Sequence, residues 1–177
     1  RETSLRFING ASIPDFHGRS PGAAPGNRAV GAAPFDGRQL GKSIHLLKPP
    51  LDLISPFGMG IATGEFWHFV NFLRKPHSFV HVARRVLRHR LDLLRYGRGM
   101  HLVNGNALIA WLLKSAFDFG VKVLTSSPAQ TLVIEDGSVR GALIAIAGRA
   151  VEIRASRGVV LATGGFPHDA SRIAGLF

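Results

Sequence analysis

The sequence predicts an α/β fold, with an α+β arrangement inside this chain, and three observations support that prediction. Between Glu65 and Phe119, apolar residues recur at intervals of three and four, which is the period of a helix. From Val121 onward, short apolar or alternating runs separated by turn residues indicate strands. Residues 1–60 hold seven prolines and nine glycines, which exclude long helices and strands. We therefore expect ordered irregular structure there, anchored to a larger body by apolar side chains: Ile13, Phe16, Phe35, Leu40, Leu46, Leu47, Leu51 and Ile54.

Three helices are expected in the middle of the chain. The first begins near Glu65 and ends or bends at Pro76, because proline cannot continue a helical hydrogen-bond ladder. The second begins with Ser78 as its N-cap and ends at Gly97. The third covers about residues 106–119, with Gly120 as its C-cap. Its expected inward face consists of Leu108, Leu112, Ala116 and Phe119.

Five strands are expected after these helices. A short strand over 121–125 follows the third helix directly, which suggests parallel pairing. Three more follow at about 130–135, 139–147 and 150–155, and Asp136-Gly137 joins the first two by the dipeptide that type I′ turns favour. The alternation in the last of these three predicts that it buries only one face. The apolar run 158–162 predicts a fully buried strand that ends in the turn Thr163-Gly164-Gly165.

The bulk composition is that of a globular protein. Hydrophobic residues make up 46% and charged residues 19% of the 177 residues. No apolar run reaches the ~18 residues that a membrane span requires. The absence of cysteine excludes disulfides and thiolate chemistry. We expect a soluble, cytoplasmic protein.

Positive charge is concentrated in one window of the chain. Of the net charge of +11, a large part comes from residues 74–98, where eight lysines and arginines face a single acid, Asp92. One interpretation is the solvated face of a surface helix, with arginine stems covering apolar neighbours. The other is a non-enzymatic basic module that binds nucleic acid or an anionic membrane. Because only Phe79 and Tyr96 interleave with the basic residues, we do not expect nucleic acid as a partner.

The second predicted helix also carries three histidines, His77, His81 and His89, at multiples of four. Arg85 stands at the intervening position and would repel a cation, and no carboxylate pairs with the histidines. We therefore expect a solvated polar stripe and no metal ion.

Several glycine-rich segments invite comparison with phosphate-binding motifs. Residues 37–43 have three residues where a P-loop needs four, and residues 58–64 miss the dinucleotide fingerprint by one position. Asn104-Gly105-Asn106 supplies a turn and a helix cap, and a cap beside a cofactor would look the same. The sharper signal is Ala162-Thr163-Gly164-Gly165-Phe166, because glycines at the end of a buried strand let the backbone approach a ligand.

Two long segments resemble a known family. They are GRGMHLVNGNALIAWLLKSAFDFGVKVLTSSPAQTLVIEDGSVRGALI and IRASRGVVLATGGFPHD, and the upstream pieces IPDFH and PFDGRQLG are similar to further landmarks. Together they resemble the fumarate reductase/succinate dehydrogenase flavoprotein superfamily, and within it the 3-ketosteroid Δ1-dehydrogenase-like branch.

The resemblance implies part of a doubly wound FAD-binding domain with a helical insertion and a three-stranded antiparallel β-meander. Residues 1–97 would be its irregular and helical part, and residues 98–177 its helix, parallel strands and meander. FAD would be the cofactor, Ala129 would offer backbone groups to the adenine, and a second set would run beside the cofactor: Ala162, Thr163, Gly164 and Gly165. The N-terminal βαβ unit and the substrate domain of such enzymes would lie outside this chain, so we expect an internal fragment that is inactive by itself.

The resemblance also implies an activity, the dehydrogenation or reduction of a C–C bond next to a carbonyl. Hydride would pass to the flavin from a small-molecule substrate, a steroid or another enone or carbonyl compound, and an external electron acceptor would reoxidise the flavin. A fumarate-reductase-type flavoprotein is the enzymatic alternative. The branch commonly has a tyrosine where this chain has Phe16, and the only tyrosine, Tyr96, lies outside the matching motifs, so no catalytic residue is assigned.

Overall fold

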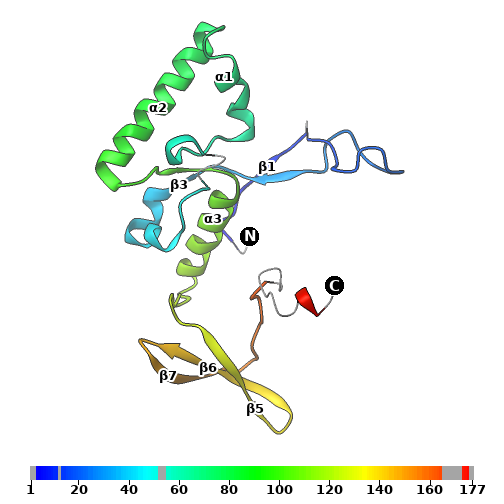
Figure 1. The fold of residues 1–177 in the computed structure, drawn as a ribbon, viewed down its shortest axis with the longest axis vertical. Coiled ribbons are helices and arrows are strands. Elements are labelled where there is room, and N and C mark those ends of the chain that lie inside the picture. The colour runs from blue at the N-terminus through cyan, green and yellow to red at the C-terminus, as the bar shows by residue number, and fades with distance from the viewer. Residues whose placement is uncertain (1–2, 12, 52–54, 165–172, 176–177) are drawn as a thin grey trace. The chain divides into compact units, whose positions relative to one another are not determined.

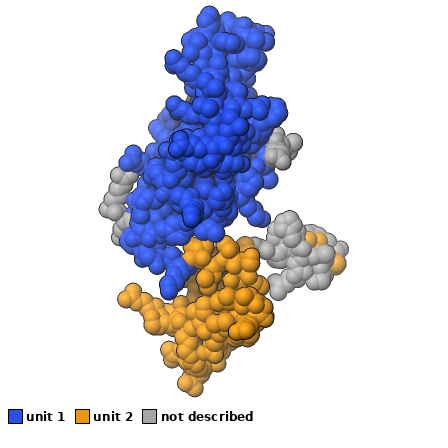
Figure 2. Space-filling model, turned by 90° about the vertical axis from the view of Figure 1, so that its left-hand side faces the viewer, with its two compact units in different colours: residues 1–122 blue, residues 123–177 orange. Residues whose placement is uncertain are grey.

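The computed structural model describes residues 3–11, 13–51, 55–164 and 173–175. The chain forms two compact units, residues 1–122 and residues 123–177 (Figure 2). Helices and antiparallel sheets are both present, so the mixed helix-and-sheet class is confirmed. The domain boundary expected at residues 97–98 falls inside the first unit and stays a prediction. Ile54, one of the expected anchors, lies outside the described residues.

The first unit begins with short strands and 3-10 segments rather than long elements. Strand β1 (Phe7–Asn9) pairs antiparallel with β2 (Val30–Ala32), and β3 (Phe35–Asp36) pairs antiparallel with β4 (His101–Leu102). The 3-10 segments are η1 (Gly37–Leu46), η3 (Pro56–Gly58) and η4 (Thr63–Glu65). Of the expected anchors, Phe35, Leu40 and Leu47 are buried. The remaining described anchors are exposed: Ile13, Phe16, Leu46 and Leu51.

The core of this unit forms where helix α3 (Asn104–Asp118) meets β3 and η1. The rings of Phe35 and Trp111 pack edge to face with their centroids 4.8 Å apart. The indole N–H of Trp111 donates to the carbonyl of Ala33 at 2.9 Å, so the ring is buried with its polar atom satisfied. The buried cluster comprises Phe35, Leu40, Ile44, Leu47, Met100, Leu102, Ala107, Ala110 and Trp111.

The inward face predicted for α3 was wrong by about one residue. The helix buries Ala107, Ala110, Trp111 and Ser115, whereas Leu108, Leu112 and Phe119 are exposed. Trp111 determines this rotation, because its large ring fills the space beside Phe35 and small residues at 107 and 110 let the backbone approach. The leucines therefore lie on the side of the helix that faces away from the described core.

Helices α1 (Phe66–Val70) and α2 (Pro76–Tyr96) follow η4 (Figure 1). Ser78 was predicted to cap the second helix, but the helix begins at Pro76, with Lys75 as its N-cap. Proline suits the first helical position, where an amide hydrogen would have no intrahelical acceptor. Ser78 is instead buried inside the helix, with its hydroxyl 3.2 Å from Nδ1 of His68. Gly97, with φ of 70°, ends the helix as predicted.

The side of α2 that packs on its own unit is polar: Ser78, Arg85, His89 and Asp92 are its buried residues. The solvated histidine stripe was therefore a wrong prediction for His89, whose Nε2 lies 2.9 Å from the carbonyl oxygen of Phe57. Arg85 is not solvated either, since it donates to Glu65 at 2.9 Å and to the carbonyl of Gly60 at 3.0 Å. Burial opposes the ionisation of Glu65, but the charge and hydrogen bond of Arg85, together with the hydrogen bond from the Ala62 amide, hold the carboxyl pKa below its ordinary value.

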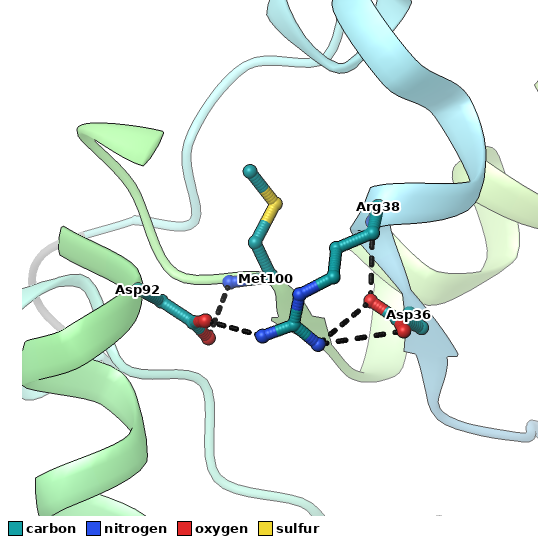
Figure 3. Close-up of polar contacts among 4 residues, drawn as sticks. All are labelled: Asp36, Arg38, Asp92 and Met100. Atoms are coloured by element: carbon teal, nitrogen blue, oxygen red, sulfur yellow. Dashed lines mark hydrogen bonds and ion pairs between the residues drawn. The ribbon is translucent and has the colours of Figure 1, made fainter. Parts of the chain in front are cut away.

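Asp92 links α2 to η1, 54 residues earlier in the sequence, and to the chain just before β4 (Figure 3). One carboxylate oxygen accepts from the Arg38 guanidinium at 2.6 Å, and the other accepts from the backbone amide of Met100 at 3.2 Å. Arg38 also contacts Asp36, whose side chain caps η1 by accepting from the Arg38 amide at 3.1 Å. Asp92 is only 4% exposed, so this network joins α2 to η1 and to the chain that enters β4.

The second unit contains a three-stranded antiparallel sheet in the order β5-β6-β7. Its strands are β5 (Ala129–Glu135), β6 (Ser138–Ile146) and β7 (Arg149–Arg154), close to the predicted ranges. Both connections have two residues with positive φ, Asp136-Gly137 and Ala147-Gly148, as type I′ turns require. A Cβ on Gly141 in β6 would fall onto the carbonyl oxygen of Ile153, so glycine is required there.

Three strand predictions for this part of the chain were wrong. The last strand of the sheet was expected to bury one face, but all six residues of β7 are exposed. Residues 121–125 and 158–162 form no strand, and the side chain of Val160 is 89% exposed. A strand exists only when a neighbour accepts its hydrogen bonds, and within the described ranges no segment pairs with either run.

We expect Asp92→Asn to lower the free energy of unfolding of the first unit by about 2–4 kcal/mol, because Arg38 loses a buried charged partner. Chemical denaturation of the two proteins, followed by tryptophan fluorescence from the core residue Trp111, would measure the difference. The same exchange at Asp118 is the matched control. Its pair with Lys114 is exposed, so Asp118→Asn should change stability by less than about 0.5 kcal/mol. Equal effects of the two substitutions would contradict the role given to Asp92.

Candidate functional site

A cavity of about 380 Å³ opens at the N-terminus of α3. Its size lies within the range of small-molecule sites, about 300–1,000 Å³. The wall is largely apolar, with a few polar groups contributed by the chain entering α3 and by Arg98. Its main lining residues come from four stretches: 49–51, 58–61, 97–99 and 101–106.

The backbone turns abruptly at the N-terminus of α3. Val103 is extended, with φ of −135° and ψ of 168°, and Asn104 takes φ of 52° before the helix proceeds. The side-chain amide of Asn104 donates to the carbonyl of Ile61 at 3.2 Å, and that of Asn106 donates to Lys48 at 2.9 Å. The two asparagines therefore fasten neighbouring loops to the helix. The backbone N–H groups of the first turn have no intrahelical acceptors and form the positive end of the helix dipole.

At two glycines near the cavity, the loop backbone packs directly against a neighbouring side chain. A Cβ on Gly60 would lie 2.7 Å from Cγ2 of Val103, and a Cβ on Gly99 would lie 2.8 Å from Nδ1 of His89. Neither substitution could be accommodated without a shift of these neighbours. The glycines thus hold the walls at a fixed separation.

Arg98 places a positive charge in the wall. Its Nη1 donates to the carbonyls of Ile44 at 2.9 Å and Leu47 at 2.7 Å, while its buried Nε has no hydrogen-bond partner among the described residues. Burial lowers the pKa of Arg98, but a guanidinium remains charged at neutral pH. With the amide groups of α3, this charge favours an anionic or carbonyl oxygen in the cavity.

His101 lines the same cavity from β4. Burial lowers its pKa below 6.5, and repulsion by Arg85 adds to that shift. The imidazole is therefore neutral at pH 7. It can donate one hydrogen bond and accept another, without adding a second positively charged side chain to this wall.

The predicted cofactor residues all belong to the second unit. Ala129 is the first residue of β5 and pairs with Ile144. Ala162 and Thr163 are exposed. Gly164 has φ of 81°, a backbone conformation in which a residue with a side chain would be strained. Gly165 lies outside the described residues. No hydrogen bond between Ala129 and residues 162–164 occurs in the described part of the chain.

Sequence reasoning missed the cavity at α3. The signal was present in the glycines at 58, 60, 97, 99 and 105, which lie far apart in the sequence and converge on the cavity. Residues 58–64 miss the spacing of the dinucleotide fingerprint by one position. Gly58 and Gly60 nevertheless line the cavity, because close packing needs glycine even where no fingerprint exists.

Comparison with known proteins identifies the kind of domain that carries this cavity. Residues 10–176 match the model of the FAD binding domain family. The chain is 36% identical to a 4-oxocyclohex-2-ene-1-carboxylate 5-dehydrogenase from Sinomonas cyclohexanicum, over 97% of this chain and 31% of that protein. It is 32% identical to a 3-oxosteroid 1-dehydrogenase from Mycolicibacterium smegmatis, over 88% of this chain and 28% of that protein.

A solved structure agrees with these sequence relatives. The 3-ketosteroid Δ1-dehydrogenase from Sterolibacterium denitrificans, in complex with 1,4-androstadiene-3,17-dione, superposes with a TM-score of 0.82 at 25% identity. The match covers 99% of this chain and 32% of that enzyme, so the chain spans about a third of the relatives it matches. The chain belongs to the FAD-binding domain family, and its cofactor is FAD. A cavity walled by helix amides and Arg98 fits the polar parts of such a cofactor.

We expect the stability of the first unit to fall as the pH is lowered below about 6.5, partly because of His101. Its pKa is lowered by folding, so the unfolded chain binds a proton first and gains from acidification. Denaturation at several pH values would show this slope, which should be smaller in His101→Gln. An imidazole that titrates at or above 6.5 in an NMR experiment would contradict the prediction.

Proposed function

We propose that this polypeptide is an FAD-dependent dehydrogenase of the 3-ketosteroid Δ1-dehydrogenase type, acting on a C–C bond next to a carbonyl. The observation that carries the proposal is the similarity over nearly the whole chain to enzymes that share one kind of reaction. The proposal concerns the full-length polypeptide, since these relatives are about three times longer than this chain.

The names of the relatives narrow the substrate class. One acts on a cyclohexenone carboxylate and the others on 3-oxosteroids, and in both cases the position dehydrogenated lies in the ring that bears the ketone. The shared element is therefore a cyclic ketone rather than the steroid nucleus. We propose a cyclic ketone as the small-molecule substrate, and a steroid ketone is the first candidate within that class.

The cofactor residues proposed for this function come from the second unit. Ala129 would offer backbone groups to the adenine, and residues 162–165 would run beside the cofactor. Support comes from Gly164, since its positive φ and its open surroundings leave room for a ligand at the backbone. The domain would be doubly wound, with β5–β7 as its β-meander and α1–α2 in its helical insertion, divided at residues 97–98.

When bound, FAD supplies the hydride acceptor, and an external acceptor then removes the electrons. This chain would contribute binding and orientation. In the α3 cavity, Arg98 and the first-turn amides would hold an anionic or carbonyl oxygen while the apolar wall excludes water. Phe16 has no hydroxyl and is exposed, and Tyr96 packs against the core beneath the Arg38 guanidinium. Neither is assigned as the base.

We expect Gly164→Ala to weaken FAD binding, because a Cβ would stand where the backbone approaches the cofactor and the residue has φ of 81°. Flavin fluorescence quenching on titration of the full-length apoprotein would measure the loss. Gly148→Ala is the matched control, since Gly148 has φ of 77° and equally open surroundings in the β6–β7 turn. Both variants carry similar backbone strain of roughly 1 kcal/mol. Equal FAD affinity in the two would remove Gly164 from the cofactor site.

The reaction itself is tested with the full-length polypeptide, FAD and an artificial dye acceptor. A 4-ene-3-oxosteroid and 4-oxocyclohex-2-ene-1-carboxylate are offered separately, and dye reduction with either supports the proposed activity. Fumarate reduction by a reduced dye, without turnover of either ketone, would instead identify the fumarate-reductase-type alternative.

A further inference from the structure

His101 borders two separate cavities of the first unit. One is the α3 cavity described above. The other, the charged cavity, has a volume of about 250 Å³, and its charged lining residues besides His101 are Asp36, Arg38, Arg88 and Asp92. Among the described residues, His101 is the one that lines both cavities. Its imidazole therefore stands between a largely apolar site and a polar one.

The register of the β3–β4 pair places an acid beside His101. Asp36 and His101 are direct cross-strand partners, as are Phe35 and Leu102. Cross-strand partners project to the same face of a sheet, and consecutive residues project to opposite faces. Because Phe35 and Leu102 belong to the buried cluster, the side chains of Asp36 and His101 lie on the other face. The Asp36 side chain is 45% exposed, so this face reaches water.

The charged cavity can hold water between His101 and the solvent. Figure 3 shows the Arg38 guanidinium between the carboxylates of Asp36 and Asp92. Asp92 is buried, whereas the side chains of Asp36 and Arg38 are both exposed to solvent. Polar groups that surround a space of this size can each hydrogen-bond to water molecules in it. Such water would connect the imidazole to bulk solvent.

The imidazole of His101 is suited to pass a proton on. Its lowered pKa is caused by burial first and then by the charge of Arg85, with no hydrogen bond to a described residue among the causes. Arg88 also lowers the pKa, while the carboxylates of Glu65 and Asp36 oppose the shift. The protonated ring therefore gives up its proton readily. The neutral ring has a donor on one nitrogen and an acceptor on the other.

We propose that His101 is a proton relay between the α3 cavity and the charged cavity. The inference rests on the proposed function, because dehydrogenation next to a ketone releases a proton that must reach water. One ring nitrogen accepts the proton in the α3 cavity, and the other nitrogen gives its own proton to water beside Asp36. A half-turn of the ring then restores the starting tautomer. The ring is neutral before and after the transfer.

The relay completes the proton balance of the proposed reaction. When the C–C double bond forms, the carbon next to the carbonyl loses a proton, and the neighbouring carbon loses a hydride to FAD. The relay moves that single proton and no electrons. If the proton stayed in the α3 cavity, it would add a positive charge to an apolar wall that already contains Arg98, which is costly.

The imidazole is not required to hold the two strands together. β3 and β4 pair through their backbones, and the amide of Gly37 donates to the carbonyl of Met100 at 2.7 Å beside them. Phe35 and Leu102 anchor the opposite face in the core. Glutamine at position 101 would keep a hydrogen-bond donor and an acceptor but could not carry a proton. His101→Gln therefore separates proton transfer from structure.

The test uses the full-length polypeptide as its own gene encodes it, loaded with FAD, with 4-oxocyclohex-2-ene-1-carboxylate or a 4-ene-3-oxosteroid as substrate and a dye as acceptor. His101→Gln should lower kcat about a hundredfold with little change in KM. It should also abolish the fall in kcat that the unchanged enzyme shows below about pH 6.5. Added free imidazole should restore part of the rate, because it supplies the missing proton carrier. His45→Gln, at an exposed position in η1, is the matched control and should leave kcat and its pH profile unchanged.

A second measurement does not depend on turnover. Asp36→Asn removes a carboxylate that favours the protonated ring, so the NMR titration of His101 should move to lower pH. Asp118→Asn, in α3, should leave that titration unchanged. A titration that Asp36→Asn does not move would overturn the path through the charged cavity.

The outcomes separate the relay from the function on which it rests. Full activity of His101→Gln with an unchanged pH profile would overturn the relay and leave the proposed function intact. A loss of rate without rescue by imidazole and without a changed pH profile would also overturn it, since His101 would then act only through structure. If the unchanged polypeptide reduces the dye with neither ketone, the proposed function fails and the relay fails with it.

Discussion

The carboxylate of Asp92 is the contact on which most of the first unit depends. It lies near the end of α2, yet it accepts hydrogen bonds from Arg38 in η1 and from the amide of Met100 just before β4. Because Met100 belongs to the hydrophobic cluster, one buried charge connects the polar side of α2 to the apolar core. Strand β4 and the turn into α3 follow Met100 in the chain and form part of the cavity wall. The contact of Asp92 with Met100 therefore helps to position that wall.

The same arrangement explains why α2 buries its polar side and exposes its apolar side. A surface helix ordinarily buries its apolar stripe. Here the buried side is held by specific partners, which are Glu65 and Gly60 for Arg85 and the Phe57 carbonyl for His89. Such hydrogen bonds are directional, so they determine the rotation of the helix as well as its position. This rotation places the leucines of α2 on its outer side, even though the first unit has a hydrophobic core.

The sequence predicted those features that depend on neighbouring residues. The dipeptide Asp136-Gly137 is sufficient for a tight hairpin turn, and Gly97 is sufficient to end a helix, because each acts through its own backbone conformation. The rotation of α3 could not be predicted, since it depends on the contact of Trp111 with Phe35, 76 positions earlier. The runs at 121–125 and 158–162 have the composition of strands, but composition does not supply a pairing neighbour. The α3 cavity was missed for a related reason, because its glycines converge only in three dimensions.

Gly141 has a consequence for how the three-stranded sheet can assemble. In the observed register it stands opposite Arg154, and its missing side chain leaves space for the Ile153 carbonyl. The other residues of β6 all carry a Cβ, so only one position along this strand accepts that close approach. If β7 slid along β6 by two residues, the carbonyl would meet a side chain and the strands would separate. Gly141 therefore selects one register of the strands. The shifted pairings that a newly made chain could otherwise sample are sterically excluded.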